Sequence, residues 1–290
     1  MNQDLAEQLT QLKKGKEPKV AIQGYDGSFH QIVARSYLGD NVETLPCDTF
    51  RQVVATMETG KADIGVMAIE NSIAGSILPN YTILQNSKMK IVGEAYLMIR
   101  QHLMANTGVK VKDIEEVQSH PIALLQCTDY LDRKKWKLVE SEDTALSARK
   151  IAESGTRTGA AIASSLAAKL FGLEIIARNI HTVKNNYTRF LVVAPLDANI
   201  KAHNADKASL YFKTDHRHGS LVDVLRTMDC TDINMTKLQS YPIPSEPFHY
   251  MFHVDMEFDN VEILIRTIDE MREKTVELNI LGIYRKGPNL

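Results

Sequence analysis

The stretch Lys184–Val193, with the sequence KNNYTRFLVV, places polar side chains directly before an apolar, β-branched run. The apolar half is typical of a buried strand. Arg189 could bind a carboxylate through a bidentate fork, and the Thr188 hydroxyl could donate a hydrogen bond or a proton. Alternatively, Thr188 could be satisfied by a backbone carbonyl and Arg189 could pair with a surface acid. Together with Asn186, these residues favour a site for a carboxylate ligand.

The position of these residues on a strand adds a constraint. Neighbouring side chains of a strand point to opposite faces, so Thr188 and Arg189 should serve different tasks. If only one of them faces the ligand, we expect it to be Thr188. The apolar residues that follow should anchor the strand and hold the polar side chains still, as a site with fixed geometry requires.

Two further polar clusters occur where a strand should end and a helix begin. Glu70, Asn71 and Ser72 follow the strand-like run Ile64–Ile69, and Ser119 and His120 precede Pro121. These side chains could simply cap the following helices. They could also line a polar ligand site, with Glu70 as an acid or orienting group and free backbone N–H groups facing an anion.

The bulk composition excludes several classes of protein. The chain has 290 residues and a net charge of −2, which gives no support to nucleic-acid binding. No apolar run approaches the ~20 residues of a membrane span. Three widely spaced cysteines and scattered histidines match neither a disulfide framework nor a zinc signature, so no metal is expected. The polar N-terminal stretch lacks a signal-peptide core, which favours the cytoplasm.

The elements around these clusters alternate between strand and helix patterns from Val20 to Val193, which predicts an α/β domain with mostly parallel strands. Ligands of such sheets bind at the carboxyl ends of the strands. Pro195–Asp206 is polar and is predicted to be a linker. The order β-α-β-β-α-β then follows, which is a ferredoxin-like α+β unit.

Four motifs in this order resemble those of the prephenate dehydratase family. The glycine-rich opening is Gly24–His30, and the motif P-I-E-N-S-x-x-G is similar to Ala68–Gly75. The motif S-H-P-Q-A-L-x-Q-C is matched by Ser119–Cys127 with Ile122 in place of glutamine, and N-x-T-R-F is matched by Asn186–Phe190. The resemblance extends over nearly the whole chain from Val20.

The C-terminal unit resembles an ACT domain, the phenylalanine-sensing module of this family. The motif G-A-L-V is similar to Gly219–Val222, and E-S-R-P is represented by Gln239–Pro242, which lacks both charged residues. The resemblance implies allosteric inhibition by L-phenylalanine, and a homodimer or homotetramer.

The resemblance also implies a two-lobed catalytic domain similar to periplasmic binding proteins. Its first lobe should comprise residues 18–98 and 178–195, its second lobe residues 99–177, and the ACT domain residues 206–290. The implied reaction converts prephenate to phenylpyruvate, water and carbon dioxide without a cofactor. Thr188 would donate a proton or a hydrogen bond to the departing hydroxyl, and Glu70 would orient the polar groups. The alternatives are an arogenate dehydratase and a non-catalytic protein that binds small anions or amino acids.

The residues expected to form the sites fall into three groups. The catalytic candidates are Thr188, Glu70 and Asn186. The substrate-binding candidates are Arg189, Asn71, Ser72, Ser28, Ser119, His120 and Gln126. The effector-binding candidates are Gly219, Ser220, Leu221, Val222, Gln239 and Ser240.

Overall fold

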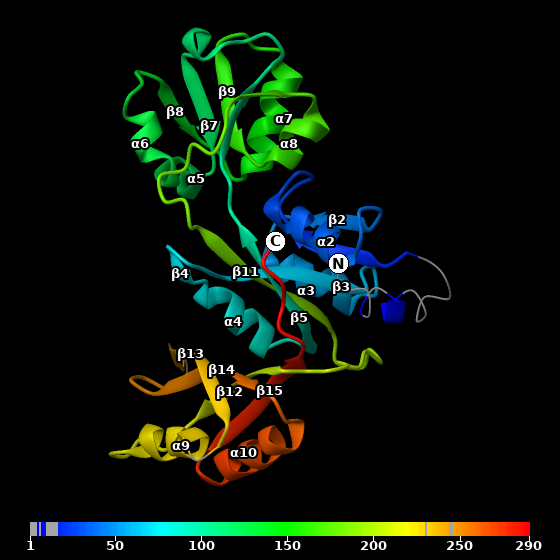
Figure 1. The fold of residues 1–290 in the computed structure, drawn as a ribbon, viewed down its shortest axis with the longest axis vertical. Helices are drawn as coiled ribbons and strands as arrows, with labels where there is room; N and C mark the ends of the chain where they lie inside the picture. Colours follow the sequence, from blue (N-terminus) through cyan, green and yellow to red (C-terminus); the bar gives the residue numbers. More distant parts are fainter. Residues whose placement is uncertain (1–4, 6, 10–16, 230, 244–245) are drawn as a thin grey trace.

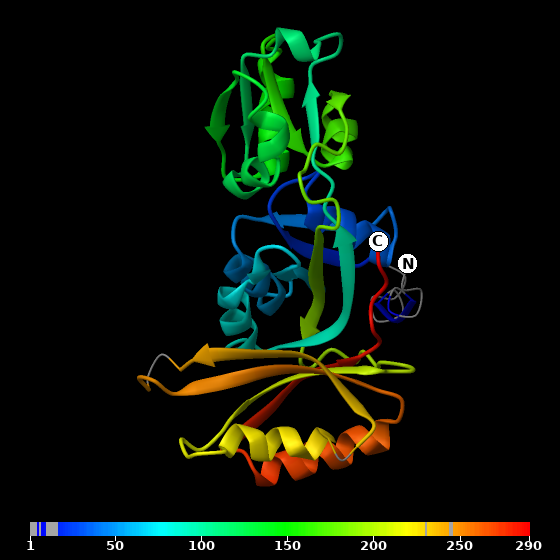
Figure 2. The same ribbon diagram turned by 60° about the vertical axis from the view of Figure 1, so that its left-hand side comes forward.

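The computed structural model describes residues 5, 7–9, 17–229, 231–243 and 246–290. These residues form three β-sheets stacked along the long axis of the molecule (Figure 1). We call the three parts lobe 1, lobe 2 and the C-terminal unit. Lobe 1 lies between the other two (Figure 2).

Lobe 1 is built on a sheet of order β2-β1-β3-β11-β5, with β4 paired to β3. Helices α2 and α3 pack on β1 and β3, and α4 packs on β3. The elements are β1 (Lys19–Gln23), α2 (Phe29–Leu38), β2 (Glu43–Cys47), α3 (Phe50–Glu58), β3 (Ile64–Asn71), β4 (Gly75–Ser76), α4 (Leu78–Gln85), β5 (Met89–Met98) and β11 (Tyr187–Pro195).

Lobe 2 is built on a sheet of order β10-β6-β9-β7-β8. Helices α7 and α8 pack together beside it, and α7 covers β9. The elements are β6 (His102–Ala105), a 3₁₀ turn (Val111–Asp113), β7 (Glu116–Ser119), α5 (Pro121–Gln126), α6 (Thr128–Leu131), β8 (Lys137–Glu140), α7 (Thr144–Ser154), β9 (Gly159–Ala163), α8 (Ser165–Phe171) and β10 (Glu174–Ala177).

The C-terminal unit has the order β-α-β-β-α-β and an antiparallel sheet of order β13-β14-β12-β15. Helices α9 and α10 cover one face, and the other face lies against lobe 1 (Figure 2). The elements are β12 (Lys207–Lys213), α9 (Ser220–Asp229), β13 (Ile233–Pro242), β14 (Tyr250–Phe258), α10 (Val261–Glu273) and β15 (Glu277–Tyr284).

The chain passes between the lobes twice, through residues 99–101 and 178–186. The second passage returns the chain into the middle of lobe 1, where β11 runs antiparallel to both β3 and β5. The prediction of mostly parallel strands is therefore wrong. Parallel pairs join β1 to β2 and β3, and β7 to β8 and β9, but both sheets are mixed.

Helix ends follow the local sequence closely. Gly155 and Gly172 end α7 and α8 in the left-handed conformation that glycine adopts without steric cost. Thr49 caps α3, and Thr49 and Gln52 form a reciprocal capping box. Within the described ranges, no helix is both long and apolar enough to cross a membrane.

Candidate functional site

Three polar side chains from β3 and β11 form a hydrogen-bonded cluster at the edge of lobe 1 that faces lobe 2. The Asn71 amide Nδ2 donates to Asn186 Oδ1 at 2.7 Å and to Thr188 Oγ1 at 2.9 Å. The Asn71 Oδ1 accepts from the backbone N–H groups of Ile73 and Ala74. Because every polar atom of Asn71 is used in this way, the side chain holds Thr188 and Asn186 in fixed positions.

The cluster adjoins a pocket of about 410 Å³ between the two lobes. Lobe 1 and the second connection between the lobes contribute one side, and α5 with the start of α6 contributes the other. The lining residues are Ile73, Ala74, Ile122, Leu125, Gln126, Thr128, Asp129, His181, Thr182, Val183 and Asn186. Such a pocket at an interface between lobes is a common place for a small-molecule site.

Two buried polar atoms beside this pocket lack partners among the described residues. They are the Nδ2 donor of Asn186, a residue with 0% exposure, and the Oε1 acceptor of Gln101. Buried polar atoms are nearly always hydrogen-bonded, because an unpaired one costs free energy. Asn186 Nδ2 therefore offers a hydrogen bond to a molecule bound in the pocket. Gln101 was not predicted, since one glutamine after a strand has no distinctive sequence signal.

The electrostatic character of the pocket comes from its rim. Burial lowers the pKa of His181, and the nearby positive charges of Lys184 and Arg100 lower it further. His181 is thus neutral at pH 7, while two cations lie close enough to act on its protonation. These two cations favour an anionic ligand, although the pocket lining also includes the carboxylate of Asp129. Neither Lys184 nor Arg100 was predicted to contribute.

Five other predicted substrate-binding residues occupy different positions. Gln126 lines the pocket, and its Oε1 accepts from Gln101 Nε2 at 3.4 Å. The Ser72 hydroxyl binds the backbone of β11, accepting from Tyr187 N at 2.9 Å. Ser28 and His120 cap α2 and α5 through their side chains, and the buried Ser119 hydroxyl donates to Ile162 O at 2.6 Å. His120 thus has the helix-capping role that was the alternative interpretation, and the structure adds a capping role for Ser28.

Arg189 is a correction. Its guanidinium points away from Thr188, to the opposite face of the sheet. Nε donates to Glu94 at 2.7 Å, NH1 forms an ion pair with Asp255, and NH2 donates to Tyr284 at 3.0 Å. With 6% of the side chain exposed, Arg189 has no free direction from which to bind a substrate. Strand alternation correctly placed Thr188 and Arg189 on different faces, whereas the assignment of Arg189 to a substrate carboxylate is wrong.

Glu70 also faces away from the cluster. It neighbours Asn71 on β3 and therefore faces the same side as Arg189, toward the C-terminal unit. Its carboxylate pairs with Lys237 Nζ of β13 at 2.7 Å. Among the described contacts no hydrogen bond joins the Glu70 side chain to the Asn71 cluster, so its predicted role as an orienting group stays a prediction and cannot act by direct contact.

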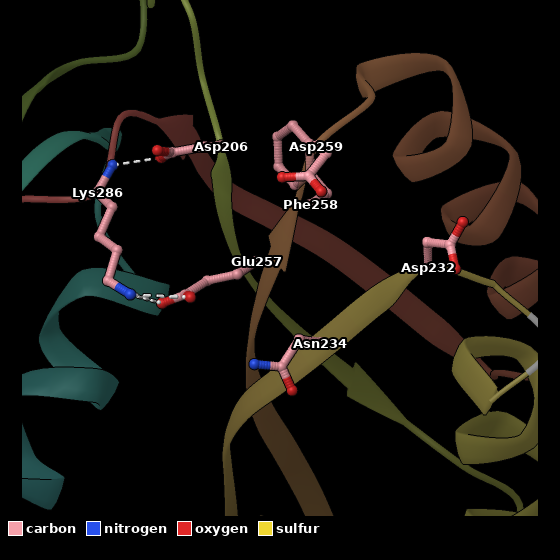
Figure 3. Close-up of a pocket in the computed structure, with 7 residues that line it drawn as sticks. All are labelled: Asp206, Asp232, Asn234, Glu257, Phe258, Asp259 and Lys286. Atoms are coloured by element: carbon pink, nitrogen blue, oxygen red, sulfur yellow. Dashed lines mark hydrogen bonds and ion pairs between the residues drawn. The ribbon is translucent and has the colours of Figure 1, made fainter.

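The predicted effector residues lie at two places on the C-terminal unit. Gly219, with a φ of 82°, precedes α9, and Ser220, Leu221 and Val222 form its first turn. Gln239 and Ser240 lie on β13. A separate hollow of about 360 Å³, lined by carboxylates and Lys286, lies at the other end of this sheet (Figure 3).

Comparison with known proteins decides the family. A family model described as prephenate dehydratase matches residues 20–197, more than half of the chain. The chain belongs to the prephenate dehydratase family. The match ends before the C-terminal unit begins at β12. It includes Asn71, Asn186 and Thr188, so the hydrogen-bonded cluster lies within the part that defines the family.

Curated prephenate dehydratase relatives extend the similarity through the C-terminal unit. The chain is 36% identical over 277 residues to a bifunctional chorismate mutase/prephenate dehydratase of Aquifex aeolicus, covering 94% of this chain and 75% of that protein. It is 34% identical over 288 residues to the chloroplastic arogenate dehydratase/prephenate dehydratase 2 of Arabidopsis thaliana, covering 96% and 75%.

Solved structures share the whole fold. A protein described as a novel type of quorum quenching acylase, GqqA, has a TM-score of 0.84 and 30% identity, covering 92% of this chain and 98% of that one. The prephenate dehydratase of Arthrobacter aurescens in complex with L-Phe has a TM-score of 0.82 and 24% identity, covering 92% and 89%. At that identity the second likeness shows the fold alone.

Proposed function

We propose that this chain is a prephenate dehydratase that converts prephenate to phenylpyruvate, carbon dioxide and water. The observation that carries the proposal is the hydrogen-bonded cluster of Thr188, Asn71 and Asn186 beside the pocket between the lobes. The family motifs supply all three residues, and the pairing of β3 with β11 brings Asn71 to Asn186 and Thr188, which lie 115 and 117 positions further along the chain.

The chemistry asks little of the protein beyond position and hydrogen bonding. The bond between the ring and its carboxylate breaks, and its electron pair enters the ring as carbon dioxide departs. The carbon–oxygen bond across the ring breaks, and hydroxide leaves with one proton as water. Thr188 is suited to polarise or protonate that hydroxyl, because Asn71 already donates to its oxygen and directs its own proton elsewhere. General-acid assistance is worth about 10²–10⁴-fold in rate.

The two carboxylates of prephenate need positive charge, which Arg189 does not supply. Lys184 and Arg100 lie near the pocket on the two connections between the lobes, and both act electrostatically on His181. Asn186 Nδ2 adds a hydrogen-bond donor without a partner in the described protein. We assign these groups to the anionic ends of the substrate.

A direct assay of phenylpyruvate formation tests the proposal. Wild-type protein should convert prephenate, and Thr188→Ala should lose most of its kcat while keeping its melting temperature. A folded Thr188→Ala variant with the wild-type kcat would remove Thr188 from the mechanism. Comparing kcat/KM for prephenate and for arogenate decides which of the two is the preferred substrate, a choice that the dual-named plant relative leaves open.

A second candidate activity is hydrolysis of an acyl amide. The pocket wall is apolar, with Ile73, Ile122, Leu125 and Val183 all substantially exposed toward it, and Ile122 stands where the family motif has glutamine. Such a wall also suits an acyl chain, and the GqqA structure is named an acylase. Incubation with an N-acyl amide that carries a long acyl chain, followed by assay of the free fatty acid, tests this activity. Ile122→Gln should weaken it and spare prephenate turnover.

Regulation and assembly are proposed from the C-terminal unit. Its ferredoxin-like topology and the Gly219–Val222 motif favour binding of L-phenylalanine as an inhibitor. The edge strands β13 and β15 leave sheet edges that can pair with a second copy, which supports a homodimer or homotetramer. The cytoplasm is the proposed compartment. Activity titrated with phenylalanine to millimolar concentration and light scattering test the first two points.

A further inference from the structure

Two cross-strand residue pairs lie side by side where β3 meets β11. Thr188 is paired with Asn71 in the sheet register, and Arg189 is paired with Glu70. The first pair faces lobe 2 and is joined by the hydrogen bond that holds the candidate catalytic hydroxyl. The second pair faces the C-terminal unit. Each residue of the first pair therefore shares a peptide bond with one residue of the second.

Both residues of the second pair are bound by charged side chains of the C-terminal unit. Asp255 of β14 forms an ion pair with Arg189, and Lys237 of β13 pairs with Glu70 at 2.7 Å. Lys237 also donates to Ser76 of β4 at 2.9 Å. The sheet of the C-terminal unit thus holds both strands at the residues next to Thr188 and Asn71.

The Arg189 contact is a buried network and not a surface ion pair. Arg189, Asp255 and Glu94 have 6%, 8% and 0% of their side chains exposed. Glu94 also accepts from Lys207 at 3.0 Å, so two cations and two carboxylates balance within the interface. Removing one partner of such a network leaves an uncompensated buried charge. The charged groups must therefore keep their positions relative to one another for the interface to remain stable.

The strands have a built-in irregularity at this point. The pairing of β11 with β3 shifts register between Arg189 and Phe190, as in a β-bulge. Bulges redirect side chains and are frequent beside active sites. When the Arg189 guanidinium is displaced, the backbone at the bulge can therefore shift locally and move the adjacent residue Thr188.

We propose that Asp255 and Lys237 are positioning residues for the reaction, acting through Arg189 and Glu70 on Thr188 and Asn71. The inference rests on the proposed dehydratase function and extends it: the C-terminal unit controls the rate by setting the placement of the Thr188 hydroxyl. A misplacement of about 1 Å can reduce a rate by about 10²-fold, so small movements of the two sheets suffice.

The test uses Lys237→Met and Asp255→Asn in the full chain. Each should lower kcat for prephenate by about 10–100-fold with KM changed by less than about threefold, and should weaken inhibition by phenylalanine. Lys237→Arg, which keeps the charge, should recover most of kcat. Arg272→Met is the control, because Arg272 pairs with Asp269 at 2.9 Å within α10, on the side of the C-terminal sheet that is turned away from lobe 1 (Figure 2). It should keep the wild-type kcat.

A second measurement keeps the proposal independent of the substrate. Amide hydrogen exchange of peptides that cover residues 68–72 and 186–190 should become faster in Lys237→Met than in Arg272→Met. If wild-type protein makes no phenylpyruvate, the proposed function fails, and the exchange data alone then decide the coupling. Unchanged exchange overturns the proposal. Wild-type kcat in folded Lys237→Met also overturns it, even where Asp255→Asn fails to fold.

Discussion

Replacing Arg189 with methionine separates a structural role from a substrate-binding role. The substitution keeps an unbranched side chain of similar length and removes the charge. Glu94 would retain Lys207 at 3.0 Å, whereas Asp255 would keep only the Ser209 hydroxyl as a direct partner. One buried carboxylate is left without a cation, which costs about 3–5 kcal/mol. At about 2 °C per kcal/mol for a chain of this size, the melting temperature should fall by about 6–10 °C.

The pH dependence of this loss gives a further check. Burial favours the neutral form of Asp255, but the Arg189 charge and the Ser209 hydrogen bond hold its pKa below the ordinary value. The stability that this low pKa provides is present above the unfolded pKa of about 4 and is lost as the pH falls through the folded pKa. Without Arg189, burial should raise the pKa of Asp255. The gap between the two melting temperatures should therefore narrow as the pH is lowered from 7 to 5.

Thermal unfolding and steady-state kinetics together decide the matter. We expect Arg189→Met to unfold earlier and to lose kcat while its KM for prephenate stays within about threefold. The double variant Arg189→Met/Asp255→Leu should recover stability, because an apolar pair can replace a buried ion pair at little cost. An unchanged melting temperature with KM raised about tenfold would refute this account and return Arg189 to the substrate.

Three further predictions address the pocket and the interface. Thr188→Ser should retain much more kcat than Thr188→Ala, which should lose about 10²–10⁴-fold, as phenylpyruvate formation will show. Lys184→Met should raise KM for prephenate about tenfold with little change in kcat, since it removes a positive charge near the pocket and leaves the Thr188 hydroxyl in place. An unchanged KM would exclude Lys184 as a substrate-binding residue. Burial lowers the pKa of His253 from 6.5 to about 4. As the pH falls from 6.5 to 4, His253 is protonated in the unfolded chain but not in the folded protein, which lowers the free energy of unfolding by up to roughly 3 kcal/mol. Since neither ring nitrogen has a partner among the described residues, His253→Phe should flatten the melting temperature between pH 7 and pH 5, and an equally steep profile would contradict this.

Local signals predicted the parts of the fold that depend on short-range chemistry. The glycines at residues 155 and 172 are local signals for the ends of α7 and α8, and the order of elements predicted the C-terminal unit. Strands with weak alternation escaped detection: β2 contains Pro46, and β8 is mostly exposed. The antiparallel placement of β11 also escaped, because it depends on the chain returning from lobe 2, which no local pattern records.

For the candidate site, too, local motifs were predictable from the sequence and long-range contacts were not. The sequence singled out Asn71, Asn186 and Thr188, of which Asn71 and Thr188 meet through the strand register and Asn186 through a side-chain hydrogen bond. The partners of Arg189 were not, since Asp255 is 66 residues away and Glu94 is 95 residues away. Each is an ordinary charged residue on a strand until the C-terminal sheet packs on lobe 1. Strand alternation showed that Arg189 faces away from Thr188, but only the tertiary structure shows what it faces.

The most direct test of the central claim is the rate at which purified wild-type protein converts prephenate to phenylpyruvate. The account predicts saturable turnover, with one carbon dioxide released per phenylpyruvate formed, and loss of that turnover in a Thr188→Ala variant that melts at the wild-type temperature. Binding of prephenate without any release of phenylpyruvate would contradict it.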